Sequence, residues 1–151
     1  MTFSIETAAK TNLYKTFIPF YLSTPSQKSS PQTHASSFSS ENLSQNPLSF
    51  IYFWGHADST PETWQQTHIE CVKGCPPGEM RMDDLEFKVL WKAADESAIL
   101  VRDHATYWNG EEKLTCWATV FYVRDETGKD GVRVVSYQET KDPKLTTMKG
   151  I

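Results

Sequence analysis

The stretch ILVRDHATYWNG, residues 99–110, predicts a β-strand that ends in a tight turn. Side chains alternate between the two faces of a strand, so Asp103 falls on the same face as the apolar Ile99 and Val101. An ionised carboxylate is costly to bury unless it is paired or hydrogen-bonded. Either the predicted phase of this strand is wrong, or Asp103 has a specific role.

The Asn109-Gly110 dipeptide predicts a two-residue hairpin, because both residues tolerate the positive φ of a type I′ turn. Such a turn sets the register with the following segment, EKLTCWATVFYVRD, and a three-residue turn at 94–96 sets it with the preceding one. With GVRVVSYQET these segments predict a four-stranded antiparallel meander. The expected pairs are Tyr107–Glu112, Ala105–Leu114, Asp103–Cys116, Val101–Ala118 and Ile99–Val120, and then Trp91–Ile99, Val89–Val101, Phe87–Asp103 and Leu85–Ala105.

Both hairpins agree on one apolar face with a single ionisable acid, Asp103, at its centre. The small side chains of Ala105, Cys116 and Ala118 leave space beside this acid, and a carboxylate next to open space suggests a pocket. Burial raises the pKa of a lone carboxyl, as acid–base catalysis requires. The alternative is a structural carboxylate held by Tyr or backbone donors. The opposite face is mixed but aromatic, which indicates partial exposure or contact with a second copy.

The first half of the chain is expected to supply helices that cover this face. An apolar stripe predicts an amphipathic helix over residues 5–22, with Ile5, Ala9, Leu13, Phe17 and Tyr21 at four-residue spacing. From Ser26 to Pro47 the chain is Ser-rich and polar, which predicts a mobile loop. Residues 48–56 predict a strand. Thr60 as the cap, Pro61 as the first helical residue and Gly74 as the stop predict a helix after it.

Bulk properties limit the classes of partner. The 151 residues suit one domain spanning 1–151, and the net charge of −4 without a Lys/Arg cluster argues against nucleic acid. No apolar run reaches membrane-spanning length. Three cysteines without a leader segment indicate a reduced, cytoplasmic setting. We expect no metal, because His68, Cys71 and Cys75 lack a fourth ligand, and no nucleotide cofactor, because a Gly-rich phosphate loop is missing.

Two further groups of residues are candidates for the site. His68 lies on the apolar stripe of the helix after residue 60, so it could share a proton with Asp103 or be an ordinary core histidine. Tyr52 could donate a hydrogen bond to a substrate oxygen. Alternatively, it could have only a structural role, as aromatic residues at strand ends often do. The residues expected to contact substrate are Trp54, His56, Asp58, Trp64, Phe87, Trp91, Tyr107 and Cys116.

The element order over residues 5–143 resembles the nuclear transport factor 2-like superfamily, with its SnoaL-like polyketide cyclases and scytalone dehydratase-like members. The likeness rests on a long N-terminal helix, a strand near WGH, a helix, and a meander ending in VVSYQETKDP. It implies an α+β fold in which a cone-shaped, curved antiparallel sheet wraps around the N-terminal helices and encloses an apolar pocket. It also implies homodimers formed through the sheet, and cofactor-free enzymes in which an Asp or His moves a proton.

The sequence therefore predicts a cofactor-free dehydratase, isomerase or cyclase that acts on a hydrophobic, polyketide-like or polycyclic molecule in a biosynthetic pathway. Asp103 would move the proton, His68 would relay or share it, and Tyr52 or Tyr107 would polarise an oxygen. The alternatives are a non-catalytic ligand-binding or dimerisation module of the same fold, or a carrier that shelters a hydrophobic ligand.

Overall fold

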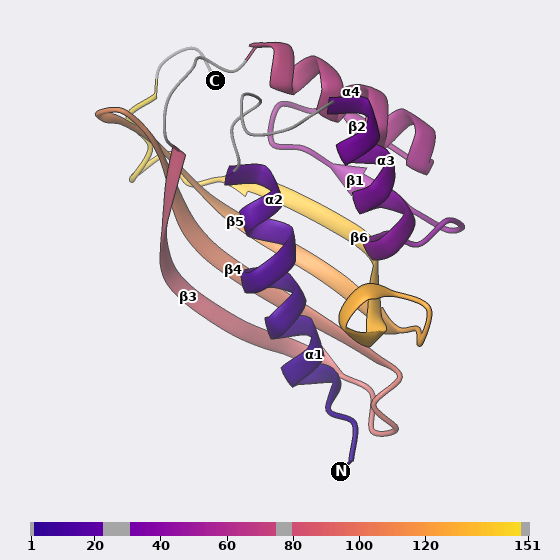
Figure 1. Ribbon diagram of the computed structural model, residues 1–151. Helices are drawn as coiled ribbons and strands as arrows, with labels where there is room; N and C mark the ends of the chain where they lie inside the picture. The colour runs from indigo at the N-terminus through magenta and orange to yellow at the C-terminus, as the bar shows by residue number, and fades with distance from the viewer. Residues whose placement is uncertain (1, 23–30, 75–79, 149–151) are drawn as a thin grey trace.

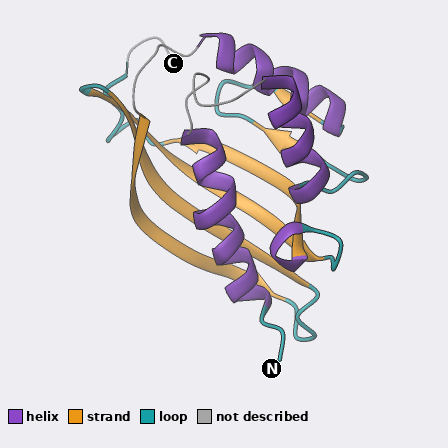
Figure 2. Cartoon of the chain, in the orientation of Figure 1, coloured by secondary structure: helices purple, strands orange, loops and turns teal. Residues whose placement is uncertain are grey.

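A computed structural model describes residues 2–22, 31–74 and 80–148, and shows a curved, unclosed sheet whose concave side is covered by helices (Figures 1 and 2). The strands lie in the order β2-β1-β6-β5-β4-β3, and all neighbours are antiparallel except β1 and β6. The elements are α1 Ile5–Asn12, η1 Leu13–Phe17, α2 Ile18–Leu22, α3 Pro31–Asn42, β1 Ser49–Ile51, β2 Ala57–Asp58, α4 Pro61–Gly74, β3 Met80–Lys92, β4 Ala98–Asn109, β5 Glu112–Arg124, η3 Lys129–Gly131 and β6 Val132–Lys141. The α+β class predicted from the sequence is confirmed.

The helix expected over residues 5–22 forms, and four residues of its apolar stripe are buried: Ile5, Ala9, Leu13 and Phe17. Ser4 begins it, since its side chain accepts a hydrogen bond from the Thr7 amide. The middle turn, η1, is π-helical, with the Ile18 amide donating to the Leu13 carbonyl. Pro19 lacks an N–H and could not continue the ordinary ladder, which suits a wide turn just before it. This turn carries Tyr14 towards the sheet.

The structure of the Ser-rich stretch differs from the sequence prediction. The mobile loop predicted for Ser26–Pro47 is wrong for Pro31–Asn42, which form helix α3, while residues 23–30 lie outside the described residues. The apolar side of α3 is narrow, but Ala35 and Phe38 are buried on it. The helix is held by tertiary contacts, which a composition argument does not register.

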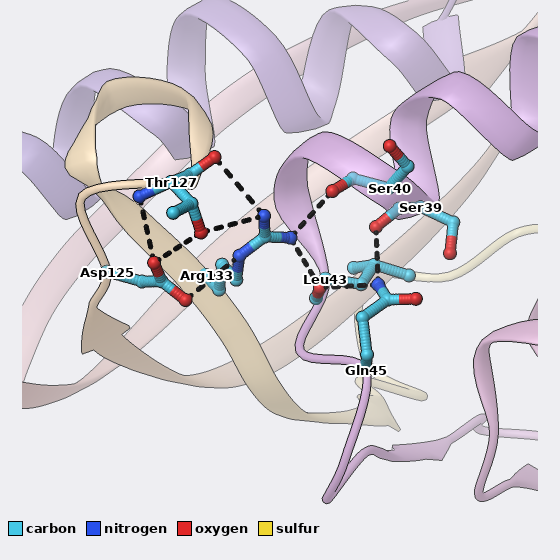
Figure 3. A network of polar contacts seen from close by, with 7 residues as sticks. All are labelled: Ser39, Ser40, Leu43, Gln45, Asp125, Thr127 and Arg133. Atoms are coloured by element: carbon cyan, nitrogen blue, oxygen red, sulfur yellow. Dashed lines mark hydrogen bonds and ion pairs between the residues drawn. The ribbon is translucent and has the colours of Figure 1, made fainter.

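Arg133, on β6, fastens the end of α3 to the sheet (Figure 3). Its guanidinium donates to the carbonyls of Ser40 at 2.7 Å and Leu43 at 2.9 Å, and it pairs with Asp125 at 3.1 Å. Further bonds reach Thr127. A cation at a helix C-terminus satisfies carbonyls that have no partner in the helix. Residues separated by about ninety positions are therefore joined by one side chain.

The strand expected over residues 48–56 is short. Only Ser49–Ile51 pair as β1, after which the chain turns at 52–56 into β2. The helix expected after residue 60 is confirmed as α4, and the Thr60 hydroxyl caps it by accepting from the Thr63 amide at 3.1 Å.

The meander is confirmed, but the register between β4 and β5 differs from the predicted one by two residues. Asn109 pairs with Glu112, so the turn is Gly110–Glu111, and Asp103 faces Ala118 instead of Cys116. An even shift leaves every side chain on its expected face. Asp103 therefore points inward as predicted, with only 2% of its surface exposed.

Register shifts within β3 and β6 move other residues between faces. In β3 they lie between Asp84 and Glu86 and between Val89 and Trp91, which leaves Leu85 48% and Trp91 51% exposed. The predicted inward positions of Leu85 and Trp91 are therefore wrong. A β-bulge opposes two residues to one and so reverses the alternation beyond it.

The core lies between the helices and the concave face. Its largest fully buried side chains include Trp64, Tyr122, Phe50, Ile5 and Leu13. Among the described residues, no helix is both long enough and apolar enough to span a membrane.

Candidate functional site

An apolar cavity of about 270 Å³ opens beside the ends of α2 and α4. The concave face of β4–β6 and the turn after β1 complete its wall. Aromatic rings dominate the lining, which comprises Phe17, Ile18, Leu22, Tyr52, Phe53, Trp54, Thr67, His68, Cys71, Tyr107, Leu114, Tyr137 and Glu139. A cavity of this size and character suits a small apolar molecule.

Glu139 places a carboxyl group in this cavity. Its Oε2 accepts a hydrogen bond from the Tyr137 hydroxyl at 2.8 Å. Burial raises the pKa of Glu139, and the bonds from Tyr137 and the Phe53 amide only partly oppose this effect. A carboxyl whose pKa is raised in an apolar cavity is a candidate for proton exchange with a bound molecule.

The turn after β1 brings three predicted residues together. The Tyr52 hydroxyl donates to Asp58 Oδ2 at 3.0 Å, and His56 Nε2 lies 3.1 Å from Asp58 Oδ1. His56 Nε2 also lies 3.0 Å from the Thr67 hydroxyl, on α4. The tight turn with Gly55 at a φ of +89° lets His56 fold back beside Tyr52. This network fixes two groups of the cavity lining, Tyr52 and Thr67.

His68 also lines the cavity, on the inner side of α4. Its ring lies between aromatic neighbours, with centroids 4.6 Å from Phe20 and 5.5 Å from Trp64. The sequence expectation that this histidine faces the sheet from α4 agrees with its burial.

Asp103 belongs to a second cluster, between η1 and β3. The Tyr14 hydroxyl lies 2.8 Å from Asp103 Oδ1 and 3.0 Å from Asp84 Oδ1. One phenol has a single proton, so both contacts are favourable only when one carboxyl is protonated. Burial and the neighbouring Asp84 raise the pKa of Asp103 to about 7, against the opposing bond from Tyr14. The same burial and charges raise the pKa of Tyr14.

The structure does not bring Asp103 and His68 together as the predicted proton-transfer pair. Asp103 lies outside the lining of the cavity described above, whereas His68 is part of it. Within the described residues, Asp103 bonds to Tyr14 and lies beside Asp84 instead.

The remaining predicted contact residues fall into two sets. Trp54 and Tyr107 line the cavity with Tyr52. Trp64 is fully buried in the core, Phe87 packs against Tyr14 with centroids 5.9 Å apart, and Trp91 lies on the outer face. Cys116 is buried on the inner face, where burial raises the pKa of its thiol to about 12. Trp64, Phe87, Trp91 and Cys116 do not line this cavity.

Sequence reasoning missed Tyr14, Asp84 and Glu139. Register shifts in β3 and β6 determine which way the side chains of Asp84 and Glu139 point. In β6, Ser136 pairs with Phe121 but Val134 pairs with Tyr122, so Val135 is the extra residue. Strict alternation from Val132 and Val134 would turn Glu139 outward. Tyr14 could have been noticed, because it follows Leu13 on the helix predicted to cover Asp103.

No group of three or more His, Cys, Asp or Glu side chains in the described ranges is arranged to hold a metal ion. The polar groups of the cavity include phenols, an imidazole and a carboxyl, which are suited to proton transfer.

The chain has the fold of nuclear transport factor 2-like proteins. No family model and no curated protein matches the sequence. An NTF2-like protein of unknown function from Pseudomonas aeruginosa superimposes with a TM-score of 0.59 at 11% identity, over 73% of this chain and 80% of that one. A proposed ketosteroid isomerase from Parabacteroides distasonis gives 0.56 at 10%, over 78% and 80%. A proposed calcium/calmodulin-dependent protein kinase type II association domain from Thiobacillus denitrificans gives 0.58 at 13%, over 92% and 95%.

Proposed function

We propose that this protein is a cofactor-free enzyme that binds a hydrophobic small molecule in the 270 Å³ cavity and moves a proton on it. The observation that supports the proposal is Glu139, a carboxyl of raised pKa within an aromatic cavity. The fold is compatible with this activity, since a proposed ketosteroid isomerase shares it. Dehydration, isomerisation and cyclisation all need such a proton transfer.

In this proposal Glu139 replaces Asp103 as the group that exchanges the proton. Asp103 keeps its predicted protonation behaviour, but its partners are Tyr14 and Asp84, and it lies outside the cavity lining. His68, which also lines the cavity, is the second proton carrier in this proposal. Tyr52 differs from the expected role, because its hydroxyl already donates to Asp58.

The test compares Glu139→Gln, Asp103→Asn and the wild type in D₂O at saturating ligand. Candidate ligands are first selected as apolar molecules that raise the melting temperature. NMR then follows deuterium incorporation at carbon and product formation. We expect Glu139→Gln to lower the rate by roughly 10²–10⁴-fold, the usual contribution of a placed acid or base. Full activity of Glu139→Gln together with loss in Asp103→Asn would return the role to Asp103.

The second candidate function is a non-catalytic association module. The outer sheet face supports it, because Trp91 is 51% exposed and stacks with Phe121 at 6.3 Å between centroids. The superimposed association domain matches nearly the whole chain. A homodimer through this face would be compatible with either function, since the cavity lies on the opposite side of the sheet.

A further inference from the structure

The hydrogen-bond donors of two cavity phenols are directed at the protein. Tyr52 donates to Asp58 Oδ2 at 3.0 Å, and Tyr137 donates to Glu139 Oε2 at 2.8 Å. A phenol has one O–H, so each of these oxygens can only accept a hydrogen bond from another group. Neither of these two hydroxyl protons is therefore directed at a bound molecule.

Glu139 places a carboxyl group in the cavity, which carries a negative charge when it is ionised. An ionised carboxylate accepts hydrogen bonds and donates none. The bonds that it receives, from Tyr137 and from the Phe53 amide, come from neutral donors. Within the described residues, no salt bridge links Glu139 to a basic side chain. A carboxylate in an apolar environment is strongly stabilised by a cation that replaces its lost water.

The aromatic rings of the cavity also favour a positively charged ligand. Tyr52 and Trp54 stack with centroids 4.5 Å apart at 18°, and Tyr137 lies 5.6 Å from Phe17. These rings belong to the cavity lining. The face of an aromatic ring carries partial negative charge and attracts ammonium groups, most strongly where water is excluded.

We propose that the cavity is selective for a protonated amine carried on an apolar body, with the ammonium group donating to Glu139 and the body lying against the aromatic rings. This inference rests on the proposed function, because it names the substrate class of that cavity. A ligand carboxylate would meet repulsion from Glu139, and a neutral alcohol would have only one weak donor to offer.

Three probes with one aromatic body test this selectivity: 2-naphthylmethylamine, 2-naphthylmethanol and 2-naphthoate. Isothermal titration calorimetry at pH 7.5 gives each Kd for the wild-type protein, so the first comparison needs no variant. We expect the amine to bind at least about 10-fold more tightly than the alcohol, and the carboxylate to bind most weakly. Equal or tighter binding of the alcohol overturns the selectivity but leaves the apolar cavity intact. Failure of all three probes to bind overturns the proposed function as well.

Variants then assign the selectivity to one carboxyl. Glu139→Gln preserves the shape of the side chain, and we expect it to bring the amine and the alcohol within about 2-fold of each other. Glu86→Gln removes an equal charge from an exposed position of β3 and should retain the wild-type preference. Circular dichroism confirms folding of both. An amine preference that survives in Glu139→Gln overturns the assignment to Glu139.

Discussion

At the scale of single residues, the protonation of Asp103 depends on two neighbouring side chains, Tyr14 and Asp84. The Tyr14 hydroxyl lies between two carboxyl oxygens, and only one of these contacts can use its proton. The second contact becomes favourable when the Asp84–Asp103 pair holds a proton of its own. Asp103 therefore favours the protonated form at a pH where an exposed aspartate is ionised.

This proton makes the stability of the fold depend on pH. The pKa of Asp103 is raised from 3.8 to about 7, so between these values the folded state holds a proton that the unfolded state has lost. The contribution of this proton to the free energy of unfolding is fully present below pH 4. It is lost as the pH rises towards 7, at up to about 1.4 kcal/mol per pH unit for one proton. Urea unfolding from pH 4.5 to 8 measures this slope.

Asp103→Asn is the matched variant, because its amide mimics the neutral carboxyl in shape. We expect the pH slope to become smaller in this variant and its stability at pH 8 to equal or exceed that of the wild type. Tyr14→Phe removes a bond that lowers the pKa of Asp103, so the loss of stability should then extend to higher pH. A wild-type slope in Asp103→Asn would show that another group titrates.

At the scale of elements, β-bulges decide which acids reach the interior. The approximate position of the turn near Gly110, the strand alternation and the helix caps were sufficient to predict the meander, α4 and the inward face of Asp103, although not the register between β4 and β5. The extra residues at Leu85 and Val135 could not be predicted, because a bulge adds one residue without a distinctive side chain. They turn Asp84 towards Tyr14 and Glu139 into the cavity lining, so the candidate site was predicted less completely than the fold.

The contact between β6 and α3 provides a prediction for a whole helix. Arg133 is only 12% exposed at its side chain, and Arg133→Ala would leave the carbonyls of Ser40 and Leu43 without this donor. We expect a loss of about 2–4 kcal/mol in the free energy of unfolding, from several charge-assisted bonds. Chemical denaturation measures it.

Lys92→Ala is the control, since Lys92 forms a more exposed ion pair with Glu96. Such pairs contribute about 0–1 kcal/mol. Arg133→Lys keeps the charge but loses the planar set of donors, so it should recover less than half of the stability. Equal stability of Arg133→Ala and Lys92→Ala would contradict the role given to Arg133.

At the scale of the whole molecule, the exposed outer face predicts self-association. Leu90 and Trp91 are 41% and 51% exposed on one edge of the sheet. Light scattering should give about twice the chain mass of 17.2 kDa, and Trp91→Glu should give the mass of one chain. Ile51→Glu changes a similarly exposed residue on β1 and should remain a dimer. A wild-type monomer at micromolar concentration would remove this support for the association function.

The position of Trp54 has an optical consequence. Its indole is 50% exposed at the cavity and stacks on Tyr52, whereas Trp64 is fully shielded. Occupancy of the cavity would strip water from the Trp54 ring and shift its emission to shorter wavelength. The protein therefore contains an intrinsic fluorescent reporter for ligand binding that needs no added dye. The variant Trp54→Phe should abolish this spectral shift.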